Sequence, residues 1–575
     1  MGILGNVLLR EVPWGLNAAL FVTAFTTAMV MLAVRRRPEL LTPRTLALQG
    51  AMLFFAAMFV IRDSIELRVY DTFAIIILMG VLVLPNFGIN VRVAGAFHYI
   101  AGFIWAGLSS LLAPFLLLGA DVDWSELPGN RISRISFAVL RGLAVALPLV
   151  LIFGALFMAA DAAYEGLVNR VFNFEIDTVI SHIVLTSLFA WLTAGYFRGS
   201  MVENFAAKAA GTPVVSPIPN VTDEQPKTDS KESEASFVDK FAAEAAEGAN
   251  SLPNNATILE HINRSDPPNE PDSVESAKPK KRDWQNWDNT SFPQVFTLGT
   301  VETVIILGLV DLLFLSFVIV QVPYLFGGME LVQNTPDLKL ADYARRGFGE
   351  LVAVAALVLP ILLTSHWLLR KDNPANQKLY KALAGIQIVL LFVIMASAVQ
   401  RLVLLTGELG YGLTTVRFYP MVLMTWLGIV FLWFGLTVLR GQRRHFAWGA
   451  LWAAIVILGA TNLVNPDKFI AETNIRLMHQ GREYDGSYNR ELSDDAVPAL
   501  LNALPYMNAD DQCHVKWKLH NRLIEGRSET DIRSWNLSRS RALLLLEDNH
   551  AVLDDHPGCE ALNFPETIPE TISED

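Results

Sequence analysis

The sequence is poor in charged residues and lacks the short motifs of common catalytic sites. Charged residues make up 18% of its 575 residues, and acidic residues outnumber basic ones, which gives a formal net charge of −12. Nucleic-acid binding needs a basic surface, so this balance argues against it. The chain has no P-loop, no glycine-rich dinucleotide turn, no His-Glu-x-x-His, no Gly-x-Ser-x-Gly and no histidine-kinase motif. No cofactor is therefore predicted and an enzymatic role is disfavoured, although enzymes acting on lipid-linked substrates often carry only scattered charges.

Histidine and cysteine show no metal-binding pattern. His98, His182 and His366 lie in different apolar blocks without the spacing of ligands, so no metal site is predicted. The two cysteines, Cys513 and Cys559, both lie in the C-terminal region. They either form a disulfide, which suits an oxidising compartment, or remain two unrelated thiols.

In place of such motifs, the chain carries long apolar blocks. Apolar residues make up 52% of the sequence, and a run of about 18 of them crosses a bilayer core of roughly 30 Å as a helix. Such blocks lie near residues 13–34, 45–62, 68–85, 97–119, 136–160, 178–197, 297–322, 347–369, 382–406, 413–439 and 446–464. The sequence therefore predicts an all-α polytopic membrane protein with about eleven transmembrane helices and the lipid bilayer as its main partner. Three arginines follow the first block and no small-residue cleavage site precedes them, so no cleavable signal peptide is expected.

Polar segments divide the apolar blocks into regions. Residues 199–296 are rich in Pro, Ser, Glu, Asp and Asn, which predicts a largely disordered linker. This linker separates about six spans in residues 1–198 from about five in residues 297–464. Residues 465–550 are predicted to form a small α-helical domain, and residues 551–575 an acidic polar tail.

Two details of the C-terminal domain can be predicted locally. Ser493 is expected to cap a helix that starts with Asp494 and Asp495, because a hydroxyl suits the cap position and negative charge suits the first turn. The run Leu543–Leu546 is expected to be buried as one apolar patch. Both features fit a domain packed on one face of the membrane.

Basic loops set the expected orientation, because short loops rich in Lys and Arg mark the cytoplasmic side. Residues 370–381 and 440–445 carry such clusters, which places the linker inside the cell and the C-terminal domain outside. The arginines of residues 35–44 fit less well, since six spans before a cytoplasmic linker would place them outside. One early segment is then re-entrant, merged or miscounted, and the candidates are the charged stretch 62–71 and the long block 90–119, which contains Pro114.

Six short motifs follow one another in the second half of the chain. They are QVPYLFGG (321–328), YARRGFGELVAV (343–354), SAVQRLVL (397–404) with YGLTTVRFY (411–419), NPDKFIAETNIR (465–476), LSDDAVPALL (492–501) and SWNLSRSRALLLL (534–546). Together they resemble a bacterial family of multipass membrane proteins known as domain of unknown function 4173, over about residues 297–546. The resemblance implies a protein of the bacterial cytoplasmic membrane with a defined membrane core, and it implies no reaction.

Polar residues gather where the spans of the second half reach the predicted outer face. They are Gln321, Tyr324, Tyr343, Arg345, Arg346, Glu350, Arg401, Glu408, Tyr411, Arg417, Tyr419, Asn465 and Asp467. Arg401 lies about 9 Å below the end of its helix, where a guanidinium needs a partner, a wet cavity or a path to the surface. Glu350, Glu408 and Asp467 are carboxylates that could pair with it. This outer-face cluster is either a clamp between helix ends and the C-terminal domain, or a pocket for an anion or a lipid headgroup.

Asp311 lies near the middle of the apolar block 297–322, apart from the outer-face cluster. A carboxylate at the membrane midplane is costly and marks a candidate proton or cation pathway. The plainer interpretation is a protonated side chain that is hydrogen-bonded to a neighbouring helix. No Lys or Arg at the same depth is evident as its partner.

These observations favour a non-enzymatic protein that uses its outer-face cluster and C-terminal domain for binding, sensing or assembly. Its partner at that face would be another protein or an anionic ligand. The first alternative is a transporter or ion-coupled permease with Asp311 on its pathway. The second is an outward-facing enzyme on a lipid-linked substrate, with Glu350 or Glu408 as base and Arg401 and Arg417 holding phosphate.

Overall fold

The computed structural model describes residues 1–10, 13–117, 176–201, 298–333, 348–370, 374–403, 406, 412–528 and 531–554. The chain divides into two units, one made of residues 1–204 with 284–575 and the other of residues 205–283. The second unit lies outside the described residues, and so does most of the predicted linker at 199–296.

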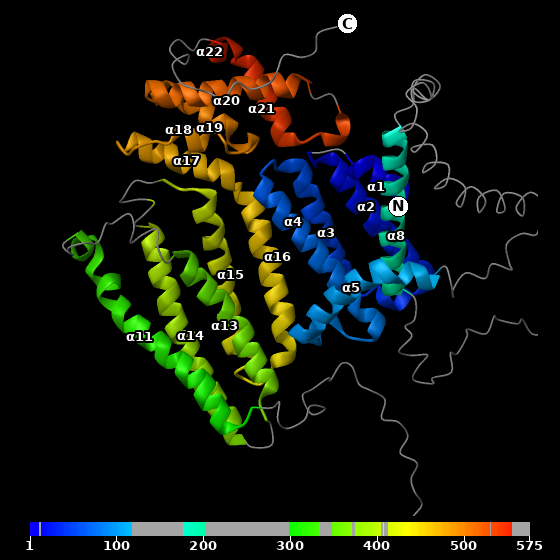
Figure 1. Cartoon of the computed structure of the whole chain (residues 1–575), viewed down its shortest axis with the longest axis vertical. Helices are drawn as coiled ribbons and strands as arrows, with labels where there is room; N and C mark the ends of the chain where they lie inside the picture. The colour runs from blue at the N-terminus through cyan, green and yellow to red at the C-terminus, as the bar shows by residue number, and fades with distance from the viewer. Residues whose placement is uncertain are drawn as a thin grey trace, which may run out of the picture. The chain divides into compact units, whose positions relative to one another are not determined.

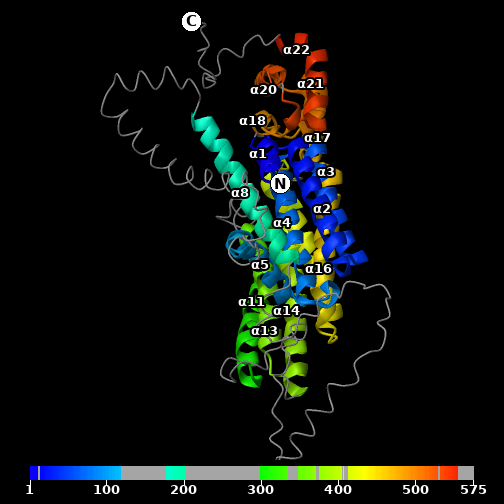
Figure 2. The ribbon, with the colours of Figure 1, turned by 90° about the vertical axis from the view of Figure 1, so that its right-hand side faces the viewer.

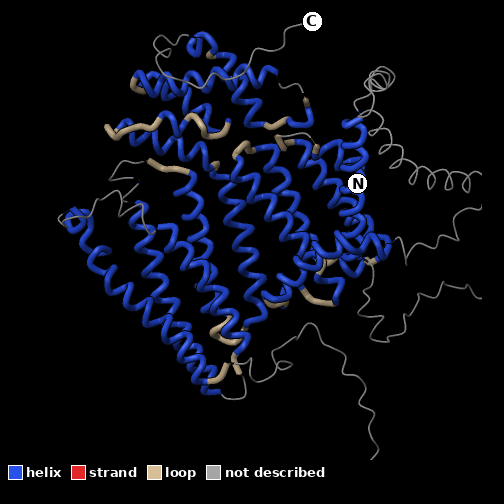
Figure 3. Tube along the Cα trace, viewed as in Figure 1, coloured by secondary structure: helices blue, strands red, loops and turns tan. Residues whose placement is uncertain are grey.

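The described part of the first unit is built from helices, as the tube in Figure 3 shows. Ten of these helices are long and apolar enough to cross a membrane, which confirms the predicted all-α polytopic membrane fold. They are α2 (Leu16–Arg36), α3 (Pro43–Ile61), α4 (Ile65–Leu82), α5 (Ala96–Leu116), α8 (Ile176–Met201), α11 (Thr300–Gln333), α13 (Phe348–Leu368), α14 (Pro374–Val403), α15 (Thr415–Thr437) and α16 (Phe446–Val464). Each coincides with one predicted apolar block, and the remaining block, 136–160, lies outside the described residues.

The membrane helices pack into two apolar clusters that α16 joins. In one cluster Phe55 is fully buried among α2, α3, α4, α5 and α8. In the other, Phe431 is fully buried among α11, α13, α14 and α15. Trp452 of α16 packs against the first cluster and Phe446 of α16 is buried in the second. Figure 1 shows α16 between α15 on one side and α3 and α4 on the other, so this helix connects the two halves of the chain.

The helix bundle has two ends with different contacts. At the first, called the domain end, α2 and α4 begin, α3 and α16 end, and the C-terminal helices (residues 466–554) lie over them (Figures 1 and 2). At the second, called the linker end, Arg37 donates a hydrogen bond to the side chain of Asn86, which donates in turn to the backbone carbonyl of Gly199. There Leu298 also pairs with Leu369 through their backbones.

The basic loops of both halves of the chain lie at the linker end. The helix α2 runs from the domain end to the linker end, so its last residues, Arg35 and Arg36, lie there. The 3-10 helix η10 (Arg443–His445), which follows α15, contacts η3 (Val91–Val93), which precedes α5. The arginines that end α2 therefore lie at the same end of the bundle as the other basic loops, and the expected conflict over residues 35–44 does not arise.

The chain turns sharply between α16 and the first C-terminal helix, α17 (Pro466–His479). Asn465 adopts a left-handed conformation with φ 61°, which asparagine tolerates better than most residues. Its side chain accepts a hydrogen bond from the backbone N–H of Lys468, and Pro466 occupies the first helical position. This turn places the C-terminal helices directly on the domain end.

The C-terminal helices surround an apolar cluster of their own. They are α17, α18 (Gly486–Asn489), α19 (Val497–Ala503), α20 (Ala509–Ser528), α21 (Leu537–Asp548) and α22 (His550–Asp554). Val497, Leu500, Val515 and Leu519 are fully buried in this cluster. The region is thus helical with its own core, as expected, while the predicted tail at 551–575 lies almost entirely outside the described residues.

Candidate functional site

The connection between α3 and α4 reaches into the C-terminal helices. Nε of Arg62 donates to the carbonyl oxygen of Asn462 at 2.8 Å, and Nη2 donates to that of Leu463 at 3.2 Å. These carbonyls end α16 and have no partner within the helix, so a cation there satisfies them and complements the helix dipole. Nη1 of Arg62 also lies 3.5 Å from the carboxylate of Asp495. One arginine therefore joins α3, α16 and the C-terminal helices.

Asp495 accepts hydrogen bonds from four residues in three segments of the chain. Its Oδ1 accepts from Nδ2 of Asn465 at 2.9 Å and from Oγ of Ser538 at 2.8 Å, and it faces Arg62. Its Oδ2 accepts from the backbone N–H of Asp63 at 2.8 Å. The side chain is only 2% exposed. A buried carboxylate is tolerated when its oxygens are satisfied in this way.

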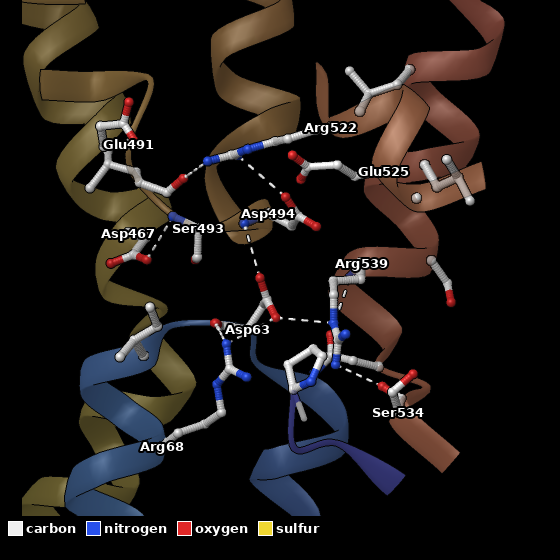
Figure 4. Close-up of a pocket in the computed structure, with 18 of the residues that line it drawn as sticks. Asp63, Arg68, Asp467, Glu491, Ser493, Asp494, Arg522, Glu525, Ser534 and Arg539 are labelled. Carbon is white, nitrogen blue, oxygen red and sulfur yellow. Dashed lines mark hydrogen bonds and ion pairs between the residues drawn. The ribbon is translucent and has the colours of Figure 1, made fainter. Parts of the chain in front are cut away.

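A ladder of opposite charges continues from the membrane helices into the C-terminal region (Figure 4). Oδ1 of Asp63 lies 3.3 Å from Nη2 of Arg68 and 3.1 Å from Nε of Arg539. The backbone N–H of Asp494 approaches Oδ2 of Asp63 at 3.4 Å. The carboxylate of Asp494 is itself 3.3 Å from Nη1 of Arg522. The ladder thus links α4, the α3–α4 connection, α21 and α20.

Uncharged amide side chains also hold the C-terminal helices on the domain end of the membrane helices. This contact region is called the junction. Nδ2 of Asn536 donates to the carbonyl oxygens of Phe59 at 2.9 Å and Arg62 at 2.7 Å, while its Oδ1 caps α21. Further along the domain end, Asn474 both donates to and accepts from the backbone of Leu413. These contacts attach the C-terminal helices to α3 and to the start of α15.

A cavity of about 920 Å³ lies within this junction. Its walls come from the start of α4, the start of α15, the α18–α19 connection, α20 and α21. Its ionisable lining residues are Asp63, Glu66, Arg68, Asp467, Glu491, Asp494, Lys518, Arg522, Glu525, Asp531 and Arg539. Seven of these are acidic and four are basic, so the cavity carries an excess of negative charge.

The four basic groups of the cavity are already paired with carboxylates. Arg68 and Arg539 contact Asp63, and Arg522 contacts Asp494. Lys518 contacts Glu491 at 2.9 Å. Within the described part of the chain, neither Glu66 nor Asp467 has a Lys or Arg partner. These two carboxylates therefore contribute to the excess negative charge.

Asp467 is a buried lining residue whose carboxylate is only partly satisfied. It is 2% exposed, and its Oδ2 accepts from the backbone N–H of Ser493 at 3.1 Å. Its Oδ1 is buried without a hydrogen-bond partner. Burial raises the pKa of Asp467 to about 6; the hydrogen bond from Ser493 opposes this rise, and the negative charge of Glu66 adds to it. Asp467 lines the cavity, and a carboxylate that is only partly satisfied there is suited to receive a donor or a cation from a ligand.

Two further acidic groups share this environment. Burial raises the pKa of Asp63 to about 6, and the adjacent Asp494 raises it further against the opposing effect of Arg68 and Arg539. Burial also raises the pKa of Asp494, against the opposing effect of Arg522. No group of three or more His, Cys, Asp or Glu side chains within the described ranges could hold a metal ion.

The structure places part of the predicted outer-face cluster at this junction. Asn465 and Asp467 belong to it directly, and the hydroxyl of buried Tyr419 lies 3.4 Å from Oγ of Ser64. Arg417 donates to the nearby carbonyl oxygen of Gly412, and Arg401 is buried at the end of α14, away from the cavity lining. Arg417 thus makes a local contact at the start of α15.

The remaining cluster residues cannot be placed in the same way. Tyr343, Arg345, Arg346, Glu408 and Tyr411 lie outside the described residues. Gln321, Tyr324 and Glu350 lie on α11 and α13, but the structure does not describe their side chains. That all thirteen residues form one cluster therefore stays a prediction.

The cysteines and Asp311 lie elsewhere. Cys513 is buried on α20 and is not a free thiol, but Cys559 lies outside the described residues, so their pairing stays a prediction. Asp311 is buried on α11, 7% exposed, far along the chain from the junction.

Residues from the first half of the chain were not among the predicted site residues. Arg62, Asp63 and Arg68 come from the stretch that was considered only as a difficulty for the topology. Asp71 of α4 was also missed; it is 2% exposed and accepts from Nδ2 of Asn462 at 2.9 Å. The available signal was the density of charge between two apolar blocks, which is costly near a membrane unless it has partners.

Comparison with known families identifies the chain. The model of the family described as Domain of unknown function (DUF4153) matches residues 49–219 and 269–503. These segments make up well over half of the sequence. The chain belongs to this family. The predicted resemblance to domain of unknown function 4173 is therefore wrong, because the matching family is a different one.

The DUF4153 match also covers the first half of the chain, where no resemblance was recognised. It includes α3 and α4 with their connection, α16, α17 and the residues up to Ala503, so it covers most of the junction. The helices α20 and α21 of this DUF4153 protein follow the matched segment. No curated protein and no solved structure matches the chain.

Proposed function

We propose that this multipass membrane protein is a non-enzymatic binding protein whose junction cavity takes a small ligand with a positively charged group. The partly satisfied carboxylate of Asp467 carries the proposal, because Asp467 lines a cavity whose basic side chains are already paired. A ligand ammonium would supply the missing donor and offset the charge of Asp467 and Glu66. The charge balance favours a cationic ligand over the anionic ligand that the sequence left open as one possible partner.

The same cavity suggests how binding would be sensed. Its walls combine Asp63 and Arg68 near the membrane helices with Asp494 and Arg522 of the C-terminal helices. A ligand that contacts both sides stabilises the arrangement in which the two sides are close together. The size of this stabilisation equals the ligand's preference for that arrangement over one in which the two sides are apart. The protein would thereby couple ligand occupancy to the helices α3 and α4.

We further infer that the linker end faces the cytoplasm of a bacterial cell and that the C-terminal helices lie outside. Support comes from Arg35, Arg36, Arg370, Arg443 and Arg444, which belong to loops or helix ends at the linker end. An alkaline phosphatase fusion after residue 554 should be active, while one within residues 205–283 should be inactive. The reverse pattern would contradict this orientation.

Ligand binding can be tested by thermal unfolding of the purified full-length protein in detergent. Ethanolamine and spermidine are expected to raise the unfolding midpoint, whereas phosphate and acetate at equal ionic strength are not. A ligand at one hundred times its Kd would add about 2.7 kcal/mol. Asp467→Asn, which keeps the acceptor for Ser493 but removes the charge, should abolish the shift.

Asp510→Asn is the matched control, because Asp510 is an exposed aspartate on α20 outside the cavity lining. It should retain the full response to amines. Stabilisation by phosphate but not by amines would contradict a cationic ligand. An unchanged amine response in Asp467→Asn would show that the amines bind elsewhere.

A further inference from the structure

Two polar residues lie at the same depth on neighbouring membrane helices, far from the junction. The helices α11 and α14 both begin at the linker end, where the hydroxyl of Thr300 donates to Oδ1 of Asn376. Asp311 lies eleven residues beyond Thr300, and Gln387 lies eleven residues beyond Asn376. At 1.5 Å per residue both lie about 16 Å from this shared starting point. Parallel, contacting helices therefore bring Asp311 and Gln387 to one level.

Both side chains are buried and unsatisfied. Asp311 is 7% exposed and Gln387 is 0% exposed. Neither carboxyl oxygen of Asp311 has a hydrogen-bond partner, and the same holds for the amide nitrogen and oxygen of Gln387. Leu307, Phe314 and Leu391 of the same helices form the apolar cluster around this level. Four orphaned polar atoms are costly in such a place, and a mutual pairing would satisfy them.

No cation lies at this level on the described parts of the packed helices. The other ionisable residues of these helices lie nearer to their ends. Toward the linker end are Glu302, His366, Lys378 and Lys381, and at the domain end are Arg401 and Arg417. Arg401 is fourteen residues beyond Gln387, about 21 Å along α14. An ionised Asp311 would therefore be an uncompensated charge in an apolar layer.

We propose that Asp311 and Gln387 form an intramembrane proton-binding site, in which the protonated carboxyl pairs with the carboxamide. The carboxyl O–H donates to the amide oxygen, and the amide N–H donates to the carboxyl carbonyl. This pair satisfies one donor and one acceptor on each side chain without any charge. The ligand of the site is a proton, and the site is separate from the cavity at the domain end.

Infrared difference spectra of the full-length protein in lipid can test this proposal. At pH 7.5, subtracting the Asp311→Asn spectrum from that of the unmodified protein should leave the C=O stretch of a protonated carboxylic acid. Gln387→Leu should shift that band to higher frequency, because the acid loses its hydrogen-bond partner while the leucine fills a buried position. Gln49→Leu, a change of another buried membrane glutamine on α3, should leave the band in place.

Three outcomes would overturn the proposal. A difference spectrum that contains only the carboxylate bands would show that Asp311 is ionised. Loss of the protonated band when sodium chloride replaces choline chloride at constant pH would assign the site to a metal cation. A band that Gln387→Leu does not shift would show that the two side chains do not pair, even though the acid is protonated.

Discussion

Replacing Asp495 with alanine is expected to cost about 3–5 kcal/mol of folding free energy, the largest loss at the junction. The substitution leaves the guanidinium of Arg62 without its carboxylate and removes the acceptor of Asn465, Ser538 and the backbone N–H of Asp63. Unsatisfied buried donors carry the full cost of desolvation. Thermal unfolding in detergent, followed by intrinsic tryptophan fluorescence, would measure the loss.

The exposed Asp510 again provides the matched control. Asp510→Ala should change the unfolding free energy by no more than about 0.5 kcal/mol. Asp495→Asn should fall between the two, because it keeps an acceptor oxygen but loses the attraction to Arg62. Equal unfolding midpoints for Asp495→Ala and Asp510→Ala would mean that Asp495 does not hold the C-terminal helices in place.

The membrane helices were predictable because the thickness of a bilayer requires a spanning helix to have a certain length and an apolar composition. Both properties can be recognised in the local sequence. Each of the ten spans coincides with an apolar block, since a helix that crosses lipid must be apolar over about twenty residues whatever its neighbours are. The positions of the basic loops could also be read, because charge in short loops is a local property as well.

The junction could not be predicted, because its contacts join distant parts of the chain. Arg62 and the carbonyl of Asn462 are 400 residues apart, and Arg62 and Asp495 are 433 apart. The sequence reveals only that charges at Arg62 and Asp63 need partners. It gives no indication that α16 ends next to α3, which depends on how two apolar clusters pack around α16.

Tertiary contacts modified two local predictions. Ser493 is the N-cap of the 3-10 helix η11 (Asp494–Ala496), which begins with two aspartates as predicted, but its side chain makes no capping bond and its backbone N–H bonds to Asp467. In the run Leu543–Leu546, Leu546 is 2% exposed but Leu544 is 62% exposed. Four consecutive helical residues point in all directions, so a single core cannot bury all of them.

The second large effect concerns pH, because Asp63 and Asp467 both have a folded-state pKa of about 6. An unfolded aspartate has a pKa of about 3.9. Between these values the folded protein holds protons that the unfolded chain has released, so stability falls as pH rises from about 4 to 6 and levels off above. Each group accounts for up to about 3 kcal/mol of this fall.

Asp467→Asn isolates one of these groups, because Asp467 has no basic partner to lose, whereas Asp63 would leave Arg68 and Arg539 uncompensated. The variant should exceed the unmodified protein in unfolding midpoint only slightly at pH 4.5, and this advantage should grow to its full size by pH 7.5. The measurement is a series of thermal unfolding curves in detergent between pH 4.5 and 8. The same substitution is expected to abolish amine binding, so greater stability would accompany lost function. A variant that is less stable at pH 7.5 would mean that ionised Asp467 stabilises the junction, contrary to the raised pKa and to the proposed role of its free oxygen.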